Sequence, residues 1–214
     1  SNTDGIFVKL EKRNVPELKR RIAEWENRTG LKMSYEAFTS IYQKDVNNYI
    51  AVPEGDLYDE KGKPRWHSKG AYVKELGDLD YDLPIVNEAV KQYLLCGTSV
   101  ERTVLECTEL RKFQKIVKLS KLYQWVEHEH EQRIAKFDNK AYRTFASRDN
   151  NDGRLMACRN TDKGLEKKKF GGTADKCFIF NDDLNGVSIP SKLDYQWYVS
   201  LSKERLKQFG YTVD

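Results

Sequence analysis

The chain has 214 residues, 33% charged and 39% hydrophobic, which suits one large or two small folded domains and excludes a disordered protein. Its 37 basic and 33 acidic residues give a net charge of +4, too small by itself to indicate nucleic-acid binding. No apolar run is long enough to cross a membrane and no secretory signal pattern opens the chain, so we expect a cytoplasmic protein without a membrane partner.

The first third of the chain predicts a strand followed by a helix. Apolar residues alternate in Ile6–Leu10, which is typical of a strand with one buried face. Asn14 followed by Pro16 predicts the start of a helix, and Gly30 predicts its end. The helix has one apolar side, so we expect it to cover a sheet.

Three further strands are predicted before residue 76. Residues 36–43 and 46–52 are rich in aromatic and β-branched types and contain no proline, as strands commonly are. Residues 67–73 predict another strand. The first 75 residues therefore predict an antiparallel sheet with a covering helix.

The segment that begins at Gly77 is acidic and predicts a connection, after which helices dominate. We expect helices over 84–95, from the capping pattern at 98–101, and over 108–116. A β part follows, in which Asp152-Gly153 between two alternating runs predicts a hairpin. A last helix begins at Asp194. The fold class predicted for the whole chain is α+β.

The order of these features resembles the C-terminal part of a family B DNA polymerase of the bacteriophage type. Four stretches carry the resemblance, which extends over nearly the whole chain: Asn2-Thr3-Asp4-Gly5 is similar to the D-T-D-S turn of the palm, Asn47-Asn48-Tyr49 to the K-x-Y strand, Ser68-Lys69-Gly70 to the K-x-K-G strand, and Asp194-Tyr195-Gln196-Trp197-Tyr198 to the final thumb helix. Three residues depart from the family pattern: Asn2 and Asn47 replace an aspartate and a lysine, and Gly5 replaces a serine.

The resemblance implies that residues 1–75 form the second half of the palm and residues 76–214 the thumb. It also implies that Asp4 is the catalytic aspartate and a Mg²⁺ ligand, because it matches the second aspartate of D-T-D-S. Two such ions lower the pKa of the primer hydroxyl and neutralise the triphosphate. The other carboxylate of the two-ion site would lie outside this chain.

The same resemblance assigns primer–template contacts to two groups of residues. The first, from the palm strands, is Asn47, Tyr49, Lys69 and Gly70. The second is the basic run that we expect on a thumb helix: Arg111, Lys112, Lys115, Lys118 and Lys121. Spacing of three places Lys112, Lys115 and Lys118 on one side of that helix. A polymerase must hold any duplex, so these contacts should reach phosphates rather than bases.

The implied function is template-directed DNA synthesis as part of a longer chain. Its partners are primer–template DNA, deoxynucleoside triphosphates and an upstream part carrying the fingers and an exonuclease, without which we expect no activity. Two alternatives stay open: a stand-alone nucleic-acid-binding module that has lost catalysis, and a protein-interaction domain.

His128 and His130 share one face of a predicted strand, which raises the question of a zinc site. No third ligand follows at a useful spacing, so we expect no zinc there.

Overall fold

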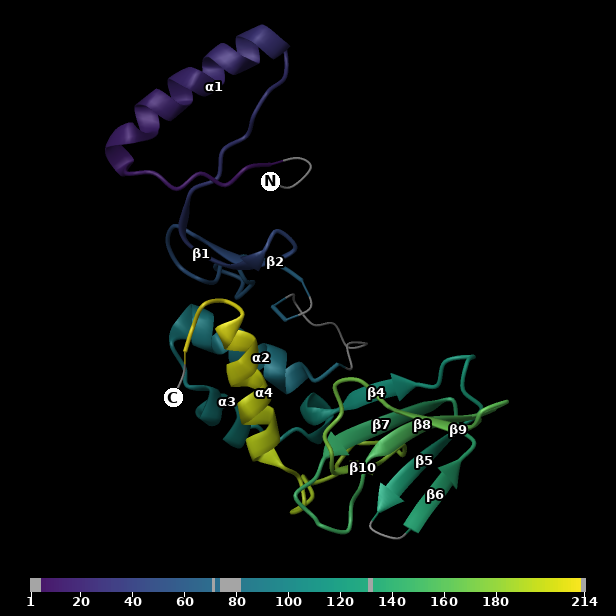
Figure 1. Ribbon diagram of the computed structural model, residues 1–214. Helices are drawn as coiled ribbons and strands as arrows, with labels where there is room; N and C mark the ends of the chain where they lie inside the picture. Colours follow the sequence, from purple (N-terminus) through teal and green to yellow (C-terminus); the bar gives the residue numbers. More distant parts are fainter. Residues whose placement is uncertain (1–4, 71, 74–81, 131–132, 213–214) are drawn as a thin grey trace. The chain divides into compact units, whose positions relative to one another are not determined.

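The computed structural model describes residues 5–70, 72–73, 82–130 and 133–212, and it divides the chain into two compact units, residues 1–69 and 70–214. The elements are mixed helices and antiparallel strands (Figure 1), so the predicted α+β class is confirmed. In the described part of the chain no helix is long and apolar enough to cross a membrane.

The first unit holds one α-helix and one small sheet. After a short 3₁₀ turn at Lys12–Asn14 comes α1 (Val15–Thr29), which ends at Gly30 in the left-handed conformation, as predicted. The strands are β1 (Phe38–Asp45), β2 (Asn48–Pro53) and β3 (His67–Lys69), in the antiparallel order β1-β2-β3. Ile50 and Ala51 in the central strand are fully buried.

Two predictions for the first unit are wrong. Residues 6–10 form no strand, and Ile6, Phe7 and Val8 are 61%, 48% and 50% exposed. Alternation alone does not make a strand, because the backbone also needs a neighbour with which to pair. Moreover, α1 contains no buried residue, and Leu18, Ile22 and Trp25 on its apolar side are only half-buried, so the helix does not cover a sheet as expected.

The second unit combines a helical layer with two sheets (Figure 1). Its elements are α2 (Pro84–Cys96), α3 (Val100–Leu105), a 3₁₀ turn at Leu110–Phe113, β4 (Lys115–Lys118), β5 (Trp125–His130), β6 (Arg133–Phe137), β7 (Ala141–Ala146), β8 (Leu155–Thr161), β9 (Gly164–Lys169), β10 (Cys177–Ile179) and α4 (Tyr195–Lys207). The sheets have the orders β10-β7-β4 and β6-β5-β8-β9, and all their pairs are antiparallel.

One apolar cluster joins the two sheets. Val117, Tyr142 and Cys177 come from the three-stranded sheet, and Val126 and Leu155 from the four-stranded one; all five are less than 7% exposed. The cluster lies between the sheets because alternate residues of each strand point to the same face.

A buried tyrosine joins the helical layer to the three-stranded sheet. Tyr198 of α4 is fully buried; its hydroxyl accepts a hydrogen bond from the Ala146 backbone N–H at 2.9 Å and donates one to the Phe113 carbonyl at 2.9 Å. Asp194 caps the same helix by accepting from the Trp197 N–H, as the sequence predicted. Within the stretch Asp194–Tyr198, the first residue therefore caps α4 and the last one connects α4 to the three-stranded sheet.

The predicted hairpin at Asp152-Gly153 is also wrong. The chain does turn there, but β7 pairs with β4 and β10, whereas β8 pairs with β5 and β9. The glycine instead lets the backbone at Glu129 come close, because a Cβ at Gly153 would lie 1.0 Å from the Glu129 carbonyl oxygen.

Candidate nucleic-acid interface

Asp4, the residue expected to bind Mg²⁺, lies outside the described residues. Among the residues that are described, no three His, Cys, Asp or Glu side chains gather closely enough to hold a metal ion.

Tyr49 and Lys69, two of the residues expected to contact the primer–template, lie directly opposite each other. They form a cross-strand pair between β2 and β3, although twenty positions separate them in the sequence. Opposite residues of an antiparallel pair point to the same face, so the phenol and the ammonium group are neighbours. Both side chains are half-buried. A phenol beside a cation can contact a sugar–phosphate backbone without reading its sequence.

Aromatic rings border this pair within the first unit. The ring of Phe7 meets Tyr49 edge-on at 5.5 Å and Phe38 at 6.0 Å, and Phe38 meets His67 at 5.9 Å. None of these three rings was predicted from the sequence to be a site residue. The one local signal for His67 is the alternation in β3, which places it on the same face as Lys69.

The other two residues of this expected group, Asn47 and Gly70, are not on strands. Asn47 was expected to share a strand face with Tyr49, but it lies in the turn before β2, where its N–H donates to the Asp45 carboxylate at 2.9 Å. The Asn48 side-chain amide donates to the same carboxylate at 2.8 Å, and these bonds lower the pKa of Asp45. Gly70 follows β3 with a φ of 99°, which a residue with a Cβ rarely adopts.

The basic run 111–121 does not form the predicted helix. Residues 110–113 form a 3₁₀ turn and residues 115–118 form β4, which pairs with β7. The alternation Lys115-Ile116-Val117-Lys118 fits a strand, and tertiary pairing decides in its favour. The lysines therefore do not lie along one side of a helix.

Carboxylates of the second unit neutralise two of the five cations. The Lys115 ammonium lies 2.6 Å from Asp82, and Lys112 lies 3.1 Å from Glu88 and 3.4 Å from Glu109. Arg111, Lys118 and Lys121 are exposed. Phosphate contacts from this region are therefore better suited to Arg111 and Lys121 than to the lysines neutralised by Asp82, Glu88 and Glu109.

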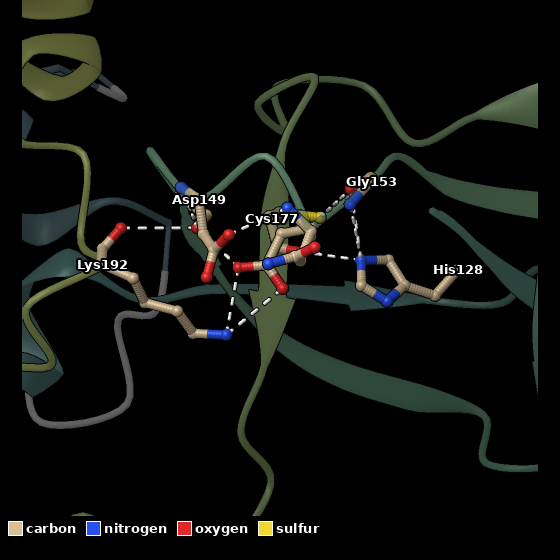
Figure 2. Close-up of polar contacts among 8 residues, drawn as sticks. His128, Asp149, Gly153, Cys177 and Lys192 are labelled. Atoms are coloured by element: carbon tan, nitrogen blue, oxygen red, sulfur yellow. Dashed lines mark hydrogen bonds and ion pairs between the residues drawn. The ribbon is translucent and has the colours of Figure 1, made fainter. Parts of the chain in front are cut away.

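His128 and Cys177 belong to a polar network that holds segments together (Figure 2). The His128 Nε2 lies 2.7 Å from the Cys177 carbonyl oxygen, so this nitrogen is the donor. The Cys177 thiol is directed at the Gly153 carbonyl, and burial raises its pKa to about 12. The imidazole therefore contacts the backbone of Cys177, and the thiol is directed at a different carbonyl.

The other side of the network fixes the segment between β7 and β8 (Figure 2). The Ser147 hydroxyl donates to Asp152 at 2.5 Å and accepts from the Asp149 N–H at 3.1 Å. Lys192 pairs with Asp152 at 3.0 Å and lies 4.7 Å above the Phe178 ring. These contacts satisfy the polar groups of the segment within the protein, which indicates a structural role.

Comparisons of the chain with protein-family models, with curated proteins and with solved structures found no match in any of the three.

Proposed function

We propose that this chain holds primer–template DNA as the palm-and-thumb part of a family B DNA polymerase. The cross-strand pair of Tyr49 and Lys69 supports this proposal most directly. The resemblance assigned both residues to the primer–template before any pairing was known, and the sheet brings them to one place. An accidental match of short motifs gives no reason for that proximity.

Exposed apolar surface in the first unit supports the idea that an upstream part of the polymerase binds here. Ile6, Phe7 and Val8 alternate like a strand but have no strand partner among the described residues, and all three are about half exposed or more. Together with the half-buried apolar side of α1, they offer a surface that another element of a sheet would cover.

In the proposed enzyme, Asp4 contributes one carboxylate to a Mg²⁺ site whose other ligands come from the upstream part. The bound ions supply activation of the primer hydroxyl and neutralisation of the triphosphate. This chain's own contribution is to bind and orient the duplex, with Tyr49 and Lys69 at the primer strand. The chain alone should therefore bind DNA but should not extend a primer.

Binding of a fluorescently labelled primed duplex to the full 214-residue chain tests the proposal. Lys69→Gln should weaken binding by about 3- to 10-fold and reduce the slope of log affinity against log salt by about one. Lys61→Gln is the matched control, because it removes an equal charge from an exposed turn of the same unit. Equal affinities of the two variants would contradict the proposed role of the Tyr49–Lys69 pair.

A second measurement separates the polymerase from a stand-alone binding module. In a longer chain that includes the upstream part, a primed duplex should be extended in the presence of Mg²⁺, and Asp4→Asn should abolish extension. A longer chain that binds the duplex without extending it, with or without the substitution, would indicate the module. Nucleotide incorporation by the isolated chain would show that the metal site does not depend on an upstream part.

A further inference from the structure

A shallow cleft of about 350 Å³ opens on the second unit, between β4, β7 and the segment after β10. Strand register defines the face on which it lies. Ile116 is opposite Arg143 and Lys118 is opposite Ala141, so these side chains share a face, whereas the alternate residue Tyr142 belongs to the core between the sheets. The cleft is therefore on the face of the three-stranded sheet opposite the core between the sheets.

The cleft lining is cationic and rich in amides. Two cations and two amides contribute to it, Lys140, Arg143, Asn139 and Asn181, and none of the described residues that line it is a carboxylate. Lys140 has no ion pair with any residue that the structure describes, and its side chain is exposed. Such a lining offers hydrogen-bond donors and positive charge, which suits an anion.

Arg143 is held in place without being neutralised. One terminal nitrogen donates to the Asp182 carbonyl at 2.7 Å and approaches the Phe180 carbonyl at 3.4 Å; both are backbone oxygens, not carboxylates. The Asn181 side chain accepts from the Arg143 backbone N–H at 2.8 Å. Within the described ranges, the Arg143 Nε is buried and has no hydrogen-bond partner. The guanidinium group thus keeps its charge and an unused donor.

We propose that this cleft binds a phosphate group, with Arg143 and Lys140 as its cationic ligands. A guanidinium group fixed by two carbonyls is pre-organised, so it loses little side-chain freedom when it binds an oxyanion. Asn139 and Asn181 supply neutral donors beside it. Lys118, on the facing strand, adds a further cation to the same face.

The cleft geometry favours a phosphate of a nucleic-acid backbone over a free phosphomonoester. Asn139, Lys140 and Asn181 are exposed, so the site is open and encloses little of a ligand. Small molecules are usually bound in cavities that bury most of their surface, whereas a polymer can be held by one phosphate among several. This choice of source rests on the proposed function; the phosphate chemistry itself does not.

Two measurements on the full chain test the cleft. The first follows the Arg143 side-chain Nε–H signal by nitrogen–proton NMR, during separate titrations with inorganic phosphate and a 20-base-pair duplex. The second measures duplex affinity of Arg143→Gln and Lys140→Gln against Lys207→Gln, which removes an exposed lysine at the far end of α4. If loss of the Arg143 hydrogen bonds disturbs folding, the affinity of Lys140→Gln still tests the cleft.

We expect a saturable shift of the Nε–H signal with the duplex, and a 3- to 10-fold loss of affinity in both cleft variants. Their salt slopes should fall by about one, whereas Lys207→Gln should bind like the wild type. Saturation by inorganic phosphate alone would support the site and assign it to a free phosphomonoester. No shift with either ligand would overturn the inference. If Lys69→Gln weakened binding while both cleft variants did not, the cleft would fail and the proposed function would stand.

Discussion

Removing the Tyr198 hydroxyl should destabilise the second unit more than any other single-atom change in α4. The hydroxyl accepts from the Ala146 N–H and donates to the Phe113 carbonyl, each at 2.9 Å, and the side chain is fully buried. Tyr198→Phe keeps the ring packing, including the edge contact with Phe113 at 5.0 Å. The substitution therefore isolates the two hydrogen bonds.

The magnitude follows from the two backbone groups that lose their partner. Ala146 is 4% exposed and Phe113 is fully buried, so water cannot replace the hydroxyl without rearrangement. A buried polar group left without a partner costs about 1–3 kcal/mol, and two such groups give a loss of about 2–4 kcal/mol after partial relaxation. For a chain of this size, that corresponds to a fall in Tm of roughly 4–16 °C.

Thermal unfolding of the full chain, followed by far-ultraviolet circular dichroism, measures this loss. Tyr195→Phe is the matched control, because Tyr195 lies in the same helix, is half-buried, and makes no hydroxyl hydrogen bond to any described residue. It should cost less than about 0.5 kcal/mol. If the two variants melted together, the hydroxyl would not join the helical layer to the sheet as we infer.

Three further predictions concern the core and the ion pairs. Gly153→Ala should lower stability by more than about 2 kcal/mol in urea unfolding, because its Cβ would collide with a backbone oxygen, whereas Gly171→Ala has open space and should be nearly neutral. Burial raises the pKa of Cys158 to about 11 and of Cys177 to about 12, above the value of 9 for a free thiol. The stabilisation from these protonated thiols is therefore fully present below pH 9, and the free energy of unfolding should fall from pH 9 towards 12. If the urea midpoint of Cys177→Ala depended on pH as strongly as that of the wild type, Cys177 would not contribute to this pH dependence. Lys115→Gln should leave duplex affinity within about twofold, because Asp82 already neutralises this lysine; a larger loss of affinity would show that the lysine reaches DNA.

Helices whose ends are set by proline, glycine or a capping side chain were predicted from the sequence. The helix that became α2 is bounded by Pro84 at its start and by Gly97, in the left-handed conformation, at its end. The Asp194 cap gave the start of α4. Proline, glycine and capping side chains act within one helical turn, so a single sequence contains what is needed to place them.

Elements that depend on a distant partner were predicted less well. Residues 115–118 fit a helix by the spacing of their lysines and a strand by alternation, and only pairing with β7 selects the strand. Likewise, two alternating runs around Asp152-Gly153 do not reveal that their strands belong to different sheets. Hydrogen bonding between strands is non-local, so short-range patterns cannot determine it.

The same division applies to the candidate sites. The sequence by itself determined the α+β class, because residue types and local order carry that information, and its resemblance to a polymerase family made Tyr49 and Lys69 candidates. Only the tertiary structure decided that these two are cross-strand neighbours, that Asp82 neutralises Lys115, and that Arg143 lies in an open cleft without a carboxylate partner among the described residues. Charge and hydrogen bonding act through space, and the positions that meet are fixed by how the strands pair.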